Sequence, residues 1–177
     1  WFVMKALFFT VLELIFRPAF VMTLIKAESV PAQFVGHFFA AGLMEECAKM
    51  LPVAGLIWLT RRYASSGSAR WGVTEPLDAV LFACASAAVF VMVETLGQYV
   101  PGAIRSATEN SGNAAIGLYV GLSLGIVRTL DSLTGHLAFS GYFGYFVGLA
   151  LLRPKQALPL VLGGYVVAST IHALGNA

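Results

Sequence analysis

The sequence predicts an all-α fold: a polytopic bundle of transmembrane helices with five to six membrane segments, one of them a candidate for re-entry. Two observations carry this prediction. The chain is 58% hydrophobic and 11% charged, with a mean hydropathy of +0.80, whereas soluble domains are typically about 25% charged. The apolar residues also gather in six stretches: 2–25, 34–60, 77–100, 113–130, 135–152 and 158–174.

The first stretch is the least regular of the six. Glu13 and Arg17 are four residues apart, so they are expected to form an ion pair on one helix face. Pro18 follows and is expected to kink or break the helix. We treat residues 1–33 as an N-terminal helix and loop, and residues 34–177 as a motif-bearing core, within a single domain 1–177.

The second stretch contains Glu45, Glu46 and Lys49 in an otherwise apolar sequence. A charged side chain at the centre of a bilayer costs roughly 3 kcal/mol or more, so such residues normally line a cavity, pair with one another or take part in chemistry. Lys49 can neutralise one glutamate but not both. The excess negative charge therefore indicates a functional site.

The remaining stretches are 77–100, which is long enough to span, and three shorter ones. Turn signals at Pro101-Gly102 and around Gly112 predict a loop over residues 98–112. Small residues recur at every fourth position and predict close helix packing. These small residues are Gly117, Gly121 and Gly125, then Gly144 and Gly148, and Ala79, Ala83 and Ala87.

Other polar residues recur at a spacing of four, which places each pair on one helix face. The pairs are Phe90 and Glu94, His136 and Ser140, and His172 and Asn176. Each residue also has a structural interpretation. Asp78 follows Pro76 and suits the first turn of a helix, and Arg128 has Asp131 as a partner near a helix end. On the same structural interpretation, Lys49 is only a counterion for one glutamate, His136 is an interfacial cap, and His172 is a core histidine bonded to a carbonyl group.

Four of these features in sequence order resemble the motifs of the PrsW family of intramembrane proteases, within the superfamily of CAAX-processing and bacteriocin-processing proteases. Glu45-Glu46-Cys-Ala-Lys49 resembles E-E-x-x-K, and Phe90-Val-Met-Val-Glu94 resembles F-x-x-x-E. His136, followed by Ala138-Phe-Ser-Gly141, and His172-Ala-Leu-Gly-Asn176 resemble the later histidine motifs. The resemblance covers residues 42–176 and implies a multi-helix peptidase of a prokaryotic cell membrane. It implies a membrane-anchored substrate, typified by an anti-sigma factor.

The resemblance, with the chemistry of hydrolysis, gives the candidate site. The catalytic candidates are Glu45, Glu46, Glu94, His136, His172 and Asn176, with Lys49, Arg128 and Asp78 in supporting roles. In the first of two mechanisms, Glu45 or Glu46 is a general base on water, and His172 and Asn176 stabilise the oxyanion. In the second, zinc activates the water, held by Glu46, Glu94, His136 and His172. H-E-x-x-H is absent from the sequence, so we favour metal-free chemistry and keep zinc as the alternative cofactor.

The depth of the candidate residues poses a difficulty. If every apolar stretch crosses the bilayer once, Glu94 lies about 20 Å from His136 and His172, which is too far for one site. A re-entrant segment at 113–130 removes the conflict. It also places most basic residues on one side, namely Arg61, Arg62, Arg70, Arg153 and Lys155, as the positive-inside rule requires. The site is then expected to open towards the extracytoplasmic half.

Two other function classes compete with a protease. Buried glutamates, histidines and a lysine also suit a proton- or cation-coupled transporter, although no internal repeat is evident and 177 residues are few for a carrier. A non-catalytic membrane scaffold is the third class. The formal net charge of +2, with basic residues scattered or at segment ends, argues against nucleic-acid binding. The predicted partners are therefore a membrane-anchored substrate and the lipid bilayer.

Overall fold

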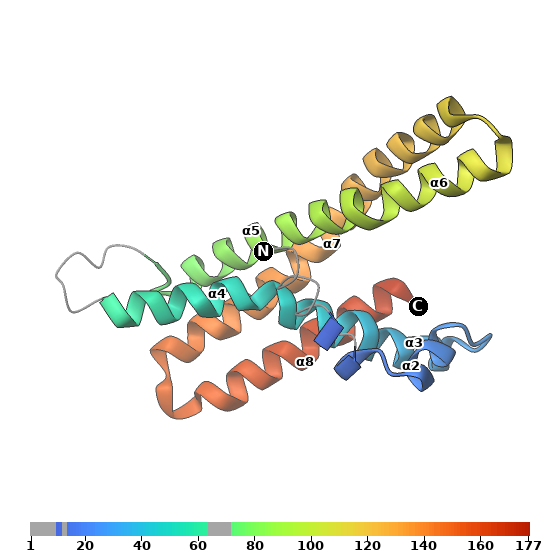
Figure 1. The fold of residues 1–177 in the computed structure, drawn as a ribbon. Coiled ribbons are helices and arrows are strands. Elements are labelled where there is room, and N and C mark those ends of the chain that lie inside the picture. Colours follow the sequence, from blue (N-terminus) through green and yellow to red (C-terminus); the bar gives the residue numbers. More distant parts are fainter. Residues whose placement is uncertain (1–9, 12–13, 64–71) are drawn as a thin grey trace.

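The computed structural model describes residues 10–11, 14–63 and 72–177, and within them it is helical almost throughout, with no strand. The all-α prediction is confirmed. The elements in chain order are α2 (Ala19–Ile25), α3 (Val30–His37), η1 (Phe38–Leu43), α4 (Met44–Tyr63), α5 (Pro76–Glu94), η3 (Thr95–Tyr99), α6 (Val100–Ser111), α7 (Ala114–Leu152), η4 (Pro154–Gln156) and α8 (Ala157–Asn176). Figure 1 shows their arrangement.

The N-terminal part breaks at Pro18, as predicted. Residues 14–16 are helical, Arg17 and Pro18 are not, and Pro18 then caps the start of α2. The expected ion pair of Glu13 with Arg17 cannot be placed, because Glu13 lies outside the described residues. Helix α3 is capped by Ser29, whose hydroxyl accepts a hydrogen bond from the amide of Ala32.

Helices α3 and α4 form one continuous helical run from residue 30 to residue 63, interrupted only by the π-helical segment η1. A π-helical turn holds an extra residue, and such turns occur frequently at functional sites. Here η1 ends at Leu43, directly before Met44 and the two adjacent glutamates. The glutamates therefore project from the first turn of α4.

The predicted loop over residues 98–112 is mostly helical, so that prediction is wrong. Helices α5 and α6 are joined by the π-helical segment η3, and only Gly112, with φ of +66°, makes a turn. Pro101 lies in the first turn of α6. Its missing N–H is tolerated there because the π-helical turn before it changes the hydrogen-bond register.

The predicted stretches 113–130 and 135–152 form one helix, α7, of 39 residues. Residues 113–130 therefore do not form a separate re-entrant segment. Helix α7 begins at Ala114, after the N-cap residue Asn113, whose side chain accepts a hydrogen bond from the amide of Ala115. The polar residues between the two stretches suggested an interruption. No proline lies in this part of the sequence, however, and a glycine such as Gly135 in a helix interior costs only about 1 kcal/mol of stability relative to alanine.

Helices α5 and α7 are antiparallel, and small residues bring them together. A β-carbon on Gly144 would lie 2.7 Å from the β-carbon of Ala83 and 2.7 Å from the carbonyl oxygen of Ala79. The glycines at 117, 121 and 125 pack in the same way against α6, so the packing role of these stripes is confirmed. Figure 1 shows α6 and the first half of α7 extending beyond the other helices.

This antiparallel hairpin resolves the depth conflict without re-entry. Helix α5 runs towards the turn at Gly112 and α7 returns beside it, so Glu94 lies next to Arg128 on α7. Among the described residues, three helical runs are long and apolar enough to cross a membrane: Pro76–Ser111, Ala114–Leu152 and Pro154–Asn176. The chain is therefore an integral membrane protein.

Candidate active site

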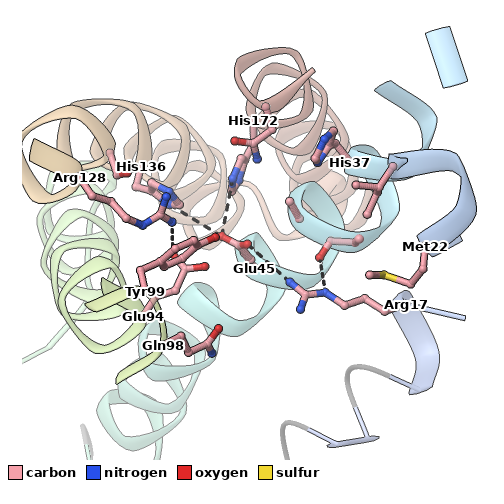
Figure 2. A pocket seen from close by; sticks show the side chains of 15 residues that line it. Arg17, Met22, His37, Glu45, Glu94, Gln98, Tyr99, Arg128, His136 and His172 are labelled. Carbon is pink, nitrogen blue, oxygen red and sulfur yellow. Dashed lines mark hydrogen bonds and ion pairs between the residues drawn. The ribbon is translucent and has the colours of Figure 1, made fainter. Parts of the chain in front are cut away.

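Five polar side chains from three helices meet in the interior of the bundle. Glu45, Glu46 and Lys49 come from α4, His136 from α7 and His172 from α8, and all five are buried. Glu45, His136 and His172 face a pocket of about 310 Å³ (Figure 2). The predicted gathering of acidic and imidazole groups from distant segments is thus present in the structure.

Glu46 is the most completely bonded member of this cluster. Its side chain has no exposed surface. Oε1 lies 2.7 Å from the ammonium of Lys49 and 3.0 Å from Nδ1 of His172, and Oε2 accepts a hydrogen bond of 2.8 Å from Ser140. A carboxylate with this many partners is held in one orientation. Glu46 therefore organises its neighbours and does not face the pocket.

Lys49 lies between both glutamates and His136. Its Nζ is 2.7 Å from Glu46 and 3.7 Å from Oε2 of Glu45. The same atom is 2.6 Å from Nδ1 of His136 and 4.9 Å from the centre of the Phe90 ring. An ammonium group has only donors, so Nδ1 of His136 accepts and the ring proton is on Nε2. Lys49 thus supplies the counterion expected from the sequence.

Glu45 differs from Glu46 because one of its oxygens has no hydrogen bond. Oε2 is buried without a hydrogen-bond partner in the described part of the chain, although Nε2 of His172 lies 3.6 Å away. Nδ1 of His172 donates to Glu46, which leaves a lone pair on Nε2. Two lone-pair atoms therefore face one small space, which is suited to holding a proton or a metal ion.

A metal ion would find three ligands at this position. Glu45, His136 and His172 each offer one ligand atom, and these atoms lie within 4.8 Å of one another. Two imidazoles and one carboxylate are a known ligand set of catalytic zinc sites. The grouping differs from the ligands expected from the sequence, because Glu45 takes part in place of Glu46 and Glu94. The residue types fit zinc, and His136 would have to give up either its ring proton or its hydrogen bond from Lys49 to act as a ligand.

The segment η1 sets the direction of the glutamates, and three contacts from outside hold it. Tyr165 donates a hydrogen bond of 2.6 Å to the carbonyl of Leu43, and Arg17 donates one of 3.0 Å to the carbonyl of Ala40. A β-carbon on Gly42 would lie 3.0 Å from the carbonyl carbon of Ser169. Only glycine allows α8 to approach this closely. His172 follows Ser169 by three residues and so meets Glu46.

The opposite wall of the pocket carries Glu94. Its Oε2 accepts a hydrogen bond of 2.9 Å from Arg128, whose guanidinium lies 3.4 Å from the centre of the Tyr99 ring. Arg128 thus pairs with Glu94 and not with Asp131. Glu94 lines the same pocket as Glu45 but stands apart from the three grouped ligands (Figure 2). It forms part of the wall that faces them.

Helix α7 supplies polar residues to the site at every fourth position. Arg128, Ser132 and His136 all line the pocket, and Ser140 continues the series to Glu46. Residues four apart share one helix face. The polarity that suggested an interruption near residue 131 therefore reflects the lining of a pocket along an unbroken helix.

Most of the sequence candidates line this pocket, Glu46 and Lys49 lie buried directly behind it, and Asp78 lies elsewhere. Asn176 lines it from the end of α8. Asp78 lies at the start of α5, where it accepts hydrogen bonds from Thr74 and Glu75 in a capping box. Asp78 therefore has the structural role, in the first turn of a helix, that the sequence offered as the alternative to a site role. The sequence candidates omitted Ser140, Ser132, Tyr99 and Arg17. The spacing of four on α7 signals the two serines, whereas no local pattern signals Arg17.

Comparison with known proteins gives a single finding. A family model described as PrsW family intramembrane metalloprotease matches residues 1–177, the full chain. No curated protein matches the chain, and no solved structure matches it.

Proposed function

The chain belongs to the PrsW family of intramembrane proteases, and from this premise we propose that it hydrolyses a peptide bond of a membrane-anchored protein at Glu45, His136 and His172. A protein with a membrane anchor, such as an anti-sigma factor, is the proposed substrate. The proposed setting is a multi-pass protein of a prokaryotic cell membrane. The observation that carries the proposal is the convergence of these three side chains, from three helices, on one pocket.

We favour zinc as the cofactor, which reverses the order expected from the sequence. The grouping of Glu45, His136 and His172 and the buried oxygen of Glu45 without a hydrogen bond support it, as does the family description. Zinc acts as a Lewis acid that polarises a peptide carbonyl and makes water more acidic. The three side chains would hold it and keep it in contact with the pocket.

Glu46 acts on the reaction through His172. Its hydrogen bond to Nδ1 fixes the imidazole tautomer, so that Nε2 faces Glu45. Carboxylates behind ligating histidines orient the ring and raise its basicity. Ser140 and Lys49 hold Glu46 in turn, and Lys49 balances the charge of two neighbouring carboxylates. The whole arrangement keeps the reacting groups in place before substrate arrives.

A metal-free reaction is the second candidate mechanism, and Lys49 favours it. Its ammonium lies 2.7 Å from Oε1 of Glu46 and 3.7 Å from Oε2 of Glu45, so a fixed positive charge already lies beside the carboxylates. In this mechanism Glu45 takes a proton from water through its unpaired oxygen. Asn176 and the Nε2–H of His136 can then donate hydrogen bonds to the oxyanion, whereas Nε2 of His172 carries a lone pair and can only accept. The proton on Glu45 passes to the leaving amine.

The pocket walls suit an extended peptide. Arg17, Met22 and Ala41 line one side, and Glu94 with Arg128 line the other. Arg128 neutralises Glu94, so that wall presents hydrogen-bonding groups without a net charge. A peptide backbone has no net charge and needs such partners when it leaves water.

The test uses protein purified in detergent and incubated with single-span membrane proteins, with and without a chelator. Loss of cleavage with chelator and its recovery with zinc would support the metal mechanism. Cleavage that resists the chelator but is lost in Glu45→Gln would support the metal-free mechanism. Full cleavage by Glu45→Gln would contradict both. Ion flux in liposomes, or substrate binding without cleavage, would point instead to a transporter or a scaffold.

A further inference from the structure

The side chain of Arg17 reaches the pocket from a part of the chain outside every recognised motif. Its Nε donates a hydrogen bond of 3.0 Å to the carbonyl of Ala40. A terminal nitrogen of the same guanidinium lies 4.0 Å from Oε1 of Glu45. Figure 2 shows Arg17 approaching Glu45 from the side opposite His172. One side chain therefore contacts both the π-helical segment η1, at Ala40, and a glutamate that follows it.

The local sequence explains why Arg17 points there. A residue before proline avoids the helical conformation, and Arg17 precedes Pro18, which is extended with φ of −62° and ψ of 159°. The chain therefore leaves its helix at Arg17 and starts α2 in a new direction. The planar guanidinium offers donors on several edges. It can bond to Ala40 with Nε and still present a terminal nitrogen to Glu45.

Arg17 has a direct consequence for the orientation of Glu45. Oε1 faces Arg17, while Oε2 faces Nε2 of His172 at 3.6 Å and Nζ of Lys49 at 3.7 Å. A carboxylate with a cation on each side has a preferred rotation about its last bond. Without the cation on the Oε1 side, the group would be free to turn Oε2 away from the histidines. The contact with Ala40 restrains the preceding turn in addition.

We infer that Arg17 is a positioning residue, which holds the carboxylate of Glu45 with Oε2 turned towards His136 and His172. The inference rests on the proposed function, since it names Glu45 as a reacting group. It also makes the N-terminal segment a part of the active site. The motif-bearing core alone would then be an incomplete enzyme.

The first test compares the full-length variants Arg17→Gln and Arg17→Lys with a control, Arg105→Gln, which changes an exposed arginine on α6. Arg17→Gln should lower kcat on the order of 10- to 100-fold, because small displacements of reacting groups have effects of this size. KM should stay within about twofold, because the guanidinium of Arg17 is engaged by Ala40 and Glu45 and the other residues that line the pocket are unchanged. The kcat of Arg17→Lys should lie between those of Arg17→Gln and the wild type. Lysine keeps the positive charge but lacks the planar guanidinium, which can donate to two groups at once. The control should match the wild type.

An unchanged kcat in Arg17→Gln would overturn the inference. A raised KM with an unchanged kcat would also overturn it, since Arg17 would then bind substrate without positioning Glu45. A wild-type protein without cleavage activity would instead refute the proposed function. These outcomes are distinguishable in one set of assays.

A second measurement does not depend on cleavage. Thermal unfolding of Arg17→Gln, Glu45→Gln and the double variant forms a double-mutant cycle. If Arg17 acts on Glu45, its substitution should lower Tm less in the Glu45→Gln background than in the wild type. Equal shifts in both backgrounds would show that the two side chains are not coupled, and would overturn the inference.

Discussion

Oε1 of Glu46 lies 3.0 Å from Nδ1 of His172, and this contact joins two residues 126 positions apart in the sequence. It connects α4 to α8 and fixes which nitrogen of His172 faces Glu45. The two adjacent glutamates thus have different surroundings. Glu46 is bonded on both oxygens, whereas Glu45 keeps one oxygen without a hydrogen bond. We expect substitutions of the two to differ accordingly.

Glu46→Gln should reduce both activity and stability. An amide cannot balance the buried ammonium of Lys49, and breaking a buried ion pair on one side costs about 3 kcal/mol or more. Losing the carboxylate behind His172 should lower kcat about 10- to 100-fold. Thermal unfolding and cleavage assays on the same preparation check both effects. An unchanged Tm would contradict the role of Glu46 as the counterion of Lys49.

Glu45→Gln should abolish cleavage at little cost in stability. Oε2 makes no hydrogen bond that the substitution could remove, and Glu46 still pairs with Lys49. We expect the free energy of unfolding to change by less than about 1 kcal/mol, in contrast to Glu46→Gln. Denaturant or thermal unfolding measures this change. A destabilisation as large as that of Glu46→Gln would mean that the two glutamates share one structural role.

Gly42→Ala should impair the site from outside the pocket. The added methyl group would overlap the backbone of Ser169 and push α8, with His172, away from Glu46. Overpacking of this kind costs typically about 1–3 kcal/mol, and cleavage should slow as well. The matched control is Gly55→Ala in α4, where a β-carbon meets nothing within 4 Å. The control should keep its activity. Equal effects in both variants would contradict the close approach of α8.

Reporter fusions test the continuous helix α7. Because one helix joins residue 114 to residue 152, fusions after Gly112 and after Leu152 should report opposite sides of the membrane. The cytoplasmic side should be that of Leu152, since Arg61, Arg62, Arg153 and Lys155 lie at that end. A fusion after Tyr63 should agree with the one after Leu152. The same side for the first two fusions would contradict a single crossing.

Much of the fold and of the site follows from local patterns in the sequence. Composition and apolar stretches predict membrane helices, and buried charge marks Glu45, Glu46 and Lys49. His136 and His172 follow from their motifs. Local patterns do not predict where a long helix stays unbroken, because polar residues such as Ser132 serve equally in a loop and in a pocket wall. Only the tertiary packing of α7, chiefly against α5, α6 and α8, distinguishes the two.

The remaining contacts depend on tertiary structure. Whether Glu46 or Glu45 faces the pocket depends on the π-helical turn before them, which no sequence pattern here indicated. Glu94 matched its motif, yet its pairing with Arg128 required the antiparallel hairpin. Arg17 depends on how the N-terminal segment packs against Ala40. Long-range placement of this kind cannot be read from spacing alone.

The repeat of polar residues along α7 makes the chemistry sensitive to helix register. Arg128, Ser132, His136 and Ser140 are spaced by about one helical turn, so sliding α7 by about 5.4 Å would put a serine where the imidazole now lies. Such a slide would keep the polar face of α7 in the interior, but the protease would lose its activity because the imidazole would no longer meet the other reacting groups. The register is set at the far end of the helix, where Gly144 meets Ala79 and Ala83. Packing residues well away from the substrate therefore control whether the reacting groups meet at all.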